Sequence, residues 1–452
     1  MHVRQWAVGG LTVLVLAVLA GPVHAQEPLL DAHLSTTTDF PNGLTFHLRT
    51  DAPVVIDHAE VRYQVDQLSC GTGTASGLVT FAATASPNLD WEWDLRDAGG
   101  LAVGAKITYH WVLSGEGRTF ETPSESVVYE DPRFDWRTIA SDHTLIQWYA
   151  GSDAFARDLL QAADAGINQL ERSTGVVPDD IVTVRIYATA EAMRETVLFS
   201  PEWAGGIAFP RHNLVAMGIG ENNLSWGRDA MVHEMTHVVI GQATFRCGSS
   251  LPAWLNEGLA VYNEGDADSV FNNALNNAVA EDRAFTVRGL AGSFPTSEDG
   301  ALLAYAQSRS LVAHLIDTYG ATRMNELLNT FQRLGTIDRA LDTVYGFDSD
   351  GLESAWRVEL GLPARAESGG VERELIPTIP PFGLPLNSSD ATPTPTPVPA
   401  APPTATPPSE PTATATPHGG SGCNRSETSA GLDGGVVLGF MLGGLALRRR
   451  NR

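Results

Sequence analysis

The residues best suited to chemistry form a short pentad, His233-Glu234-Met235-Thr236-His237. On a helix, residues four positions apart lie on one face, so both imidazoles can reach a single metal ion. Glu234 lies one step, roughly 100°, further round the same helix, where its carboxylate can contact a water on the metal. The pentad therefore predicts a metal site with Glu234 as its general base.

A second helix is predicted from the sequence Leu-Pro-Ala-Trp-Leu-Asn-Glu-Gly at residues 251–258. Pro252 suits the first helical position, where its missing N–H costs nothing. Glu257 on this helix offers a third ligand. Two histidines and one carboxylate leave a fourth position open, which is the pattern of a catalytic rather than a structural zinc site. His233, His237 and Glu257 are thus the predicted ligands of one Zn2+ ion per chain.

The elements that must position these residues belong to a mixed α/β region expected over residues 133–365. Valines and an isoleucine flank the pentad, as a buried helix requires. Helices are predicted over residues 153–173, 225–242 and 252–263 and over most of 300–345, with Gly320 and Gly335 as ends. Strands are predicted at residues 144–149, 181–187, 205–209 and 214–217.

Residues 26–132 have a different pattern. Apolar and polar residues alternate in short runs at residues 44–48, 61–65, 107–112 and 126–129, with Gly, Pro, Asn and Asp between the runs. This spacing predicts a small all-β sandwich of the immunoglobulin or fibronectin kind. It carries no catalytic cluster, so a spacer or docking role is expected.

The metal segments resemble the gluzincin metallopeptidases of the peptidase MA type, in which a thermolysin-like helix pair carries zinc. The matching stretches are residues 233–237, 251–260 and 304–308, the last leading to residues 315–320. The resemblance covers roughly residues 134–345. The expected fold class is therefore α+β, with a thermolysin-like zincin domain preceded by the all-β sandwich.

The resemblance also implies roles for single residues. It implies peptide-bond hydrolysis with His233, His237 and Glu257 on zinc and Glu234 as general base. Tyr305 becomes the candidate donor to the oxyanion, although a core aromatic would look the same, and His212 and His314 are alternatives.

Substrate binding is the second point on which the resemblance bears. Residues 205–208 (Gly-Gly-Ile-Ala) resemble the edge strand along which an extended peptide would bind, or form a plain turn. Aminopeptidases of this group carry an acidic motif for the substrate amino terminus, and the chain has no clear copy of it. An endopeptidase is therefore expected, with a peptide or protein as substrate.

The two ends of the chain predict export and attachment. Residues 1–25 read as a signal peptide, with an apolar run and a small-residue cleavage site. Residues 366–421 form a Pro/Thr-rich stalk. Residues 422–452 hold a short apolar segment and a terminal arginine cluster, which resembles a bacterial surface-sorting signal or acts as a weak membrane anchor. The expected location is the cell surface.

Charge and cysteine content exclude some classes of protein. The formal net charge is −24, and the whole of it falls between residues 26 and 365. Such an acidic body repels nucleic acid and anionic lipid. Three cysteines are too few for a disulfide-built scaffold. Cys70 and Cys247 could pair in an oxidising compartment or remain free thiols, and Cys423 lies apart.

Two other classes of function compete with the peptidase. One is a catalytically silent, metal-stabilised binding protein, which would have no need of Glu234. The other is a structural surface protein, which accounts for the stalk but not for residues 233–257. The oligomeric state has no signal in the sequence.

Overall fold

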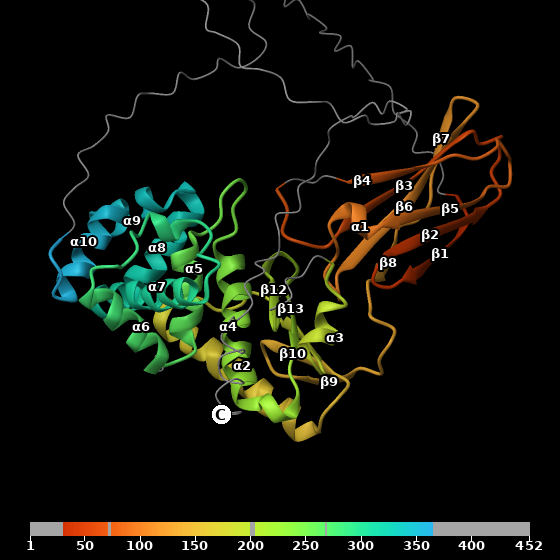
Figure 1. Cartoon of the computed structure of the whole chain (residues 1–452). Helices are drawn as coiled ribbons and strands as arrows, with labels where there is room; N and C mark the ends of the chain where they lie inside the picture. Colours follow the sequence, from red (N-terminus) through yellow and green to blue (C-terminus); the bar gives the residue numbers. More distant parts are fainter. Residues whose placement is uncertain (1–29, 71–73, 199–203, 267–268, 365–452) are drawn as a thin grey trace, which may run out of the picture. The chain divides into compact units, whose positions relative to one another are not determined.

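The computed structural model describes residues 30–70, 74–198, 204–266 and 269–364 (Figure 1). These residues all belong to one unit. The predicted signal peptide, stalk and C-terminal anchor lie outside the described residues. Among the described helices, none has both the length and the apolar character needed to cross a membrane.

Two antiparallel sheets build residues 30–129, which we call the N-terminal module. One has the order β1-β2-β5, and the other has the order β4-β3-β6-β7 with β8 paired to β6. Because successive strand residues face opposite sides, Phe46, Val61 and Trp111 point from both sheets into one core. The strands and one short helix are β1 (Ala32–Asp39), β2 (Gly43–Thr50), β3 (His58–Val65), β4 (Ala75–Val79), β5 (Asn88–Asp94), α1 (Leu95–Ala98), β6 (Lys106–Gly115), β7 (Arg118–Glu121) and β8 (Glu125–Val128). The likeness to immunoglobulin or fibronectin domains stays a prediction.

A mixed five-stranded sheet follows, in the order β12-β13-β11-β10-β9. The three central strands are parallel, and the two edge strands run antiparallel to their neighbours. Its strands are β9 (Arg137–Ala140), β10 (Thr144–Trp148), β11 (Val182–Tyr187), β12 (Gly206–Phe209) and β13 (Leu214–Gly218). All four strands predicted from the sequence are present, and β9 is an addition at one edge.

Helices make up most of the remaining chain, and together with the sheets they give a mixed α+β fold. They are α2 (Asp153–Thr174), α3 (Ala190–Arg194), α4 (Leu224–Ala243), α5 (Ala253–Asn263), α6 (Ser269–Ala280), α7 (Glu298–Tyr319), α8 (Ala321–Leu334), α9 (Ile337–Tyr345) and α10 (Ser349–Glu359), with single 3-10 turns η1 (Pro210–His212), η2 (Glu221–Asn223) and η3 (Gly289–Ala291). The predicted ends at Gly320 and Gly335 are the C-caps of α7 and α8.

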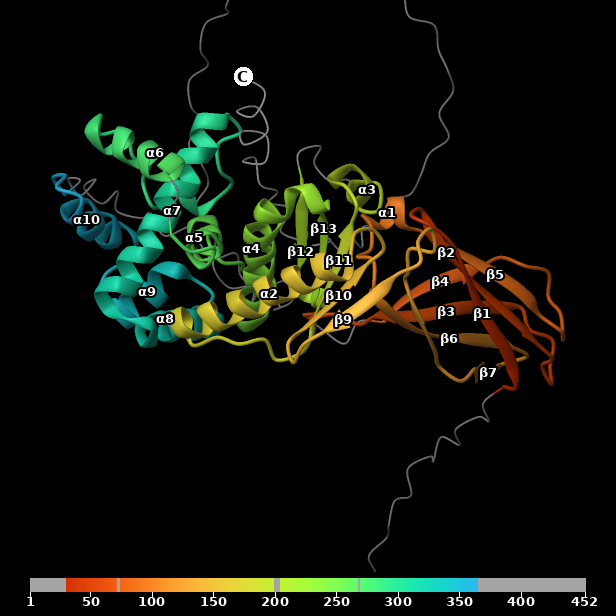
Figure 2. The same ribbon diagram turned by 90° about the horizontal axis from the view of Figure 1, so that it is seen from below.

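Helix α4 is the central helix of this part of the chain. It packs against β12 on one side and α5 on the other, as both views show (Figures 1 and 2). From Ala230 to Ile240 it is buried on nearly all faces, including Met231, Met235, Val239 and Ile240. A helix that is apolar all round belongs in the interior. The pentad is therefore held rigidly between a sheet and a second helix.

Candidate metal centre

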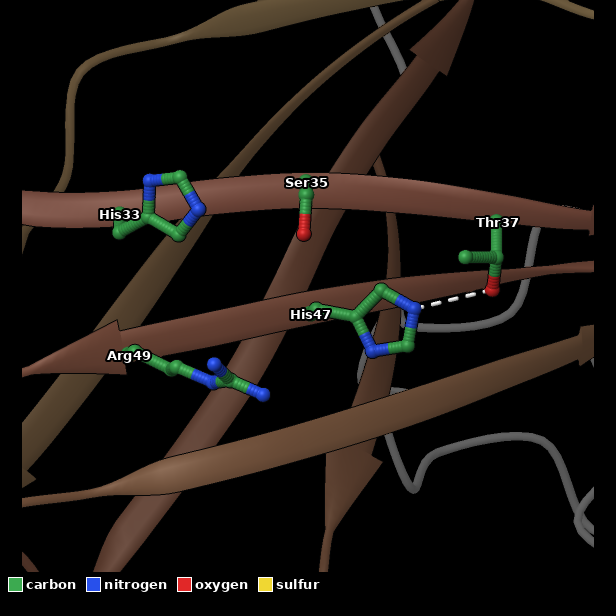
Figure 3. A pocket seen from close by; sticks show the side chains of 5 residues that line it. All are labelled: His33, Ser35, Thr37, His47 and Arg49. Carbon is green, nitrogen blue, oxygen red and sulfur yellow. Dashed lines mark hydrogen bonds between the residues drawn. The ribbon is translucent and has the colours of Figure 1, made fainter.

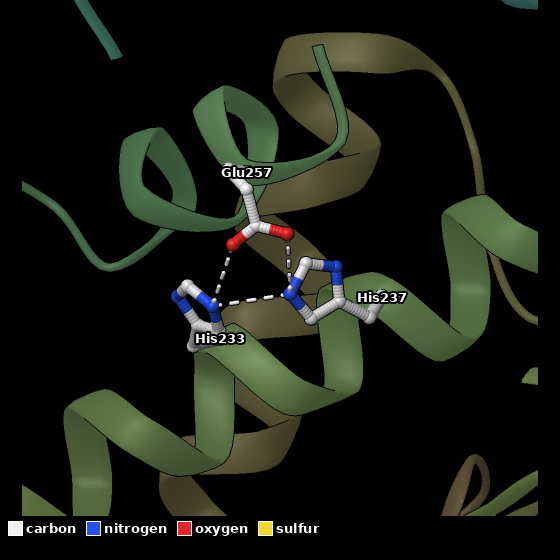
Figure 4. Close-up of side chains that lie close together, drawn as sticks. All are labelled: His233, His237 and Glu257. Carbon is white, nitrogen blue, oxygen red and sulfur yellow. Dashed lines mark hydrogen bonds and ion pairs between the residues drawn. The ribbon is translucent and has the colours of Figure 1, made fainter. Parts of the chain in front are cut away.

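The structure brings together the three residues predicted to bind metal. His233 and His237 lie one turn apart on α4, and Glu257 reaches them from α5 (Figure 4). All three side chains are buried, with at most 1% of their surface exposed. Such burial of two imidazoles and a carboxylate is costly unless they satisfy one another or share a cation.

Gly258, the residue after Glu257, allows α5 to pack closely against α7. This packing positions Glu257. A Cβ atom at Gly258 would lie 2.4 Å from the backbone oxygen of Ser308 on α7. Trp254 and Leu255 anchor the same helix in the core. Pro252, predicted as the first helical residue, instead caps the helix with extended backbone, one residue earlier. In the Glu257-Gly258 pair, the glycine therefore allows close helix packing and the glutamate supplies the carboxylate of the cluster.

The distances between the ligand atoms fit zinc. The two Nε2 atoms of His233 and His237 are 3.1 Å apart. Glu257 places Oε2 3.5 Å from the first of them and Oε1 3.6 Å from the second. Bonds of about 2.0–2.2 Å arranged tetrahedrally around zinc would separate the ligand atoms by about 3.3–3.6 Å. The two imidazoles and the carboxylate therefore face one another at close to the spacing of zinc ligands.

The charges in the cluster also suit a cation. Burial opposes the charge on His233, but hydrogen bonds to Glu257 and Glu264 outweigh it and raise the pKa of the imidazole. Burial likewise opposes the charge on Glu257, yet the nearby histidines lower the pKa of this carboxyl. Glu257 is therefore ionised at neutral pH. A buried carboxylate with two imidazoles is a donor set that zinc accepts.

Glu234 lies beside this cluster and is equally buried. Its carboxylate has no side-chain hydrogen-bond partner among the described residues, and the backbone N–H of Ala208 on β12 is the group that favours its charged form from the strand. Burial raises the pKa of Glu234 to about 7, against the opposing charges of the histidines. A carboxyl that titrates near neutral pH can both accept and release a proton.

The edge strand β12 runs directly past Glu234. A Cβ atom at Gly206 would lie 2.8 Å from Oε1 of Glu234, so only glycine allows the backbone this close. The strand pairs with β13 along one edge and ends the sheet on the other. Residues 205–208, predicted to form an edge strand or a plain turn, are thus a strand next to the cluster, apart from Gly205, which precedes it.

Tyr305 also reaches the site, from α7. Its pKa is raised well above the usual value, first by burial and then by the charges of Glu257, Glu234 and Glu264. Glu257 is thus close enough to the hydroxyl to contribute to this rise. The ring packs edge-on against Phe294 at a centroid distance of 5.2 Å. Its hydroxyl is therefore within reach of the space in front of the ligands.

The two alternative donors lie elsewhere. His314 is nine residues after Tyr305 on the same helix, hence on the opposite face, and its Nδ1 contacts Glu359. His212 belongs to η1 and hydrogen-bonds the backbone of Asp66 in the N-terminal module. Neither histidine joins the group formed by His233, His237 and Glu257.

One member of the site was missed from the sequence. Glu264 places Oε1 2.7 Å from Nδ1 of His233. A carboxylate at this nitrogen fixes the ring so that Nε2 faces the metal position. Glu264 follows Glu257 by seven residues, two helical turns, and so falls on the same side of the chain. That spacing was the available signal.

A surface hollow on the N-terminal module is separate from this centre. It is lined by β1 and β2 side chains, and His47 bridges Thr37 and Asp90 at 2.9 and 2.6 Å (Figure 3). Its other lining residues are His33, Ser35 and Arg49. The hollow is open to solvent and includes none of the buried groups that surround Glu257.

One protein family and several solved structures are similar to this chain. Residues 162–361 match the family model described as the Peptidase MA superfamily. A search of curated proteins found no match. Among solved structures, an M1 zinc metallopeptidase from Deinococcus radiodurans is similar at 15% identity and TM-score 0.35, covering 74% of this chain and 94% of its own.

Two further solved structures are similar at comparable levels. An aminopeptidase N family protein from Idiomarina loihiensis has 10% identity and TM-score 0.35, covering 70% of this chain and 73% of its own. Aminopeptidase A from Legionella pneumophila, in complex with aspartic acid, has 11% identity and TM-score 0.33. The match covers 73% of this chain and 49% of the aminopeptidase chain. The family match contains all of the ligands, Glu234 and Tyr305. The part of the chain that carries the metal centre is therefore similar to the Peptidase MA superfamily.

Proposed function

We propose that this protein is a zinc-dependent peptidase of the gluzincin type that cuts within peptide chains. The observation that carries the proposal is the close grouping of the two Nε2 atoms, 3.1 Å apart, with the Glu257 carboxylate, whose two oxygens lie 3.5 and 3.6 Å from them, next to the buried carboxylate of Glu234. A purely structural metal site needs no such base. His233, His237 and Glu257 would hold one zinc ion, and Glu264 would orient His233.

The residues of the chain have separate tasks in this proposal. When bound, zinc supplies Lewis-acid chemistry and makes water more acidic. Glu234 takes the proton of the attacking water, holds it on its carboxylate and passes it to the leaving amine. The pKa of about 7 suits both steps at neutral pH. The hydroxyl of Tyr305 donates a hydrogen bond to the oxyanion that develops on the substrate.

Strand β12 provides the place for the substrate. An extended peptide can add to a free sheet edge through backbone hydrogen bonds, without a demand on its side chains. At Gly206 this edge passes Glu234, so a bound peptide would lie across the base. The strand carries no acidic side chain, which a terminal ammonium group would need on burial. This favours cleavage inside a chain over removal of the first residue.

A peptide library blocked at both ends tests this proposal. The full chain, loaded with zinc, should cut acetylated and amidated peptides at interior bonds, detected by mass spectrometry. Cleavage restricted to peptides with a free amino terminus would make it an aminopeptidase instead. A zinc-loaded chain that cuts nothing would favour the alternative, a metal-stabilised binding protein.

We also propose that the protein is exported and tethered at the cell surface. Residues 1–25 and the stalk and anchor at residues 366–452 support this from the sequence. The disulfide between Cys70 and Cys247 suits an oxidising compartment. Cell fractionation and N-terminal sequencing of the mature protein test it. A soluble intracellular protein that keeps Met1 would rule it out.

A further inference from the structure

A disulfide ties the N-terminal module to the connector between the two ligand helices. Cys70 follows strand β3 of the module, and Cys247 lies between α4 and α5, midway between His237 and Glu257. The bridged residues are 177 positions apart. The sequence left open whether Cys70 and Cys247 form a disulfide or remain free thiols. In the structure they form the disulfide.

A second link lies two residues from Cys70. The N–H of Leu68 donates to the backbone oxygen of Arg211 at 2.9 Å. In return, Nε of Arg211 donates to the backbone oxygen of Leu68 at 2.7 Å. Arg211 belongs to η1, which directly continues edge strand β12. The loop of residues 66–70, which we call the clamp loop, thus holds the end of the proposed substrate strand.

The turn η1 is also fixed against α4 and the connector. Asn213, which caps η1, accepts a hydrogen bond from Nε2 of Gln242 near the end of α4, at 2.7 Å. The guanidinium of Arg211 lies 5.8 Å from the ring centre of Phe245 in the connector. The turn therefore lies between the clamp loop and the helix of the metal ligands.

The parts of the site differ in how strongly the core holds them. Helix α5 buries Trp254, Leu255 and Leu259 in the main core, so the position of Glu257 depends little on the connector. Strand β12 has only four residues and pairs with a neighbour on one side. Ile207 and Ala208 of this strand are fully buried, so the core holds their side chains, whereas the backbone of a short edge strand is paired along one edge only and opens more easily than a buried helix. Loss of the clamp should therefore affect β12 far more than the metal ligands.

We infer that the clamp loop positions the substrate strand: with the Cys70–Cys247 bond and the Leu68–Arg211 hydrogen bonds, it keeps η1 and β12 in the geometry that receives a peptide. The N-terminal module is then a part of the peptide site and more than a spacer. The kinetic consequence rests on the proposed function. The ordering of residues 206–213 does not, because it can be measured without any substrate.

The test uses the full chain with Cys423→Ser as parent, so that no third thiol interferes. The double variant Cys70→Ser/Cys247→Ser should exchange the amide hydrogens of residues 206–213 faster than the parent, measured by mass spectrometry. Exchange in the middle of α4 should stay unchanged. Zinc affinity should stay within about twofold. For a cleaved peptide, KM should rise roughly 5- to 30-fold while kcat changes little.

Two further variants separate positioning from general stabilisation. Arg211→Ala should raise KM and local exchange with the disulfide intact, and Arg211→Lys, which keeps a donor, should recover part of the loss. Arg246→Met removes hydrogen bonds from the connector to the backbone of Gln332 and Arg333 on α8, away from the clamp loop, and should leave KM unchanged.

Either of two results would overturn the inference. One is parent-like exchange at residues 206–213 in both the cysteine and the Arg211 variants. The other is a loss of zinc and a uniform rise in exchange, which would make the disulfide a general stabiliser. If the parent cleaves no peptide, the proposed function fails, and the exchange experiment still decides the role of the clamp loop.

Discussion

Nδ1 of His233 and Oε1 of Glu264 lie 2.7 Å apart, which turns the opposite ring nitrogen toward His237 and Glu257. The imidazole therefore has one nitrogen committed to a carboxylate and the other to the metal position. Glu264 itself is nearly buried, and burial raises its pKa although His233 opposes this. The ligand geometry thus depends on a residue outside the ligand set.

Glu264→Gln should weaken zinc binding by about 10- to 100-fold, because the amide orients the ring but no longer makes it more basic. Competition with a fluorescent chelator gives the affinity. Glu281→Gln is the matched control, since it removes the same charge from an exposed carboxylate whose ion pair among the described residues is with Arg283. Equal affinities in the two variants would show that Glu264 does not support the metal.

Tyr305→Phe should lower kcat by about 100-fold with little change in KM or zinc content, because the lost hydroxyl acts on the oxyanion. The ring can keep its contact with Phe294. Steady-state kinetics provide the measurement. Tyr345→Phe is the control, as its hydroxyl is buried without a hydrogen-bond partner among the described residues. An unchanged kcat in Tyr305→Phe would assign this ring to the core.

Gly258→Ala should destabilise the fold by about 1–3 kcal/mol, because the added methyl would meet the backbone oxygen of Ser308 at 2.4 Å. It should also weaken zinc binding, since α5 must shift away from α7 and carry Glu257 with it. Thermal unfolding with and without zinc measures both effects. Gly292→Ala has open space around it and should unfold like the parent. Equal stability of the two variants would contradict the close approach.

His212 should make the fold sensitive to mild acid. Burial lowers its pKa to about 4, although a hydrogen bond to the Asp66 backbone opposes this. Between pH 6.5 and 4 the unfolded chain then binds more protons than the folded one. Above pH 6.5 the contribution of His212 to the free energy of unfolding should not change with pH. As the pH drops to 4, this contribution should fall by up to about 3 kcal/mol.

The measurement is urea unfolding across this pH range, with a chelator present so that zinc does not contribute. His212→Gln should show a shallower loss of stability in acid than the parent. His33→Gln, at an exposed position on β1, is the control and should keep the parental slope. The same slope in both variants would mean that His212 is already protonated in the fold.

The sequence could predict that His233, His237 and Glu257 lie together because the signals are local. The pentad and the Trp-Leu-Asn-Glu-Gly segment each lie within one helix, and the apolar residues around them mark both helices as buried. The same reasoning located the strands at residues 144–149 and 181–187, where apolar runs are dense. In these segments local pattern and tertiary packing favour the same structure.

The features that were missed or left open depend on tertiary contacts or on weak local patterns. Helix α6 is rich in asparagine, a poor helix former, and buries only Phe271 and Ala278. Strand β1 is largely threonine and polar, and no residue of it is fully buried. The pairing of Cys70 with Cys247 spans 177 positions, and no local pattern determines it. Only the folded chain brings these segments together.

The central claim is tested most directly by comparing zinc content and peptide cleavage in the parent and in Glu234→Gln. Both chains should hold one zinc ion, because Glu234 is not a ligand, and treatment with a chelator should remove both metal and activity. The parent should cut blocked peptides, and the variant should lose about 100- to 10,000-fold in kcat/KM. Equal cleavage by both chains, or a zinc-loaded parent that cuts no peptide, would contradict the account.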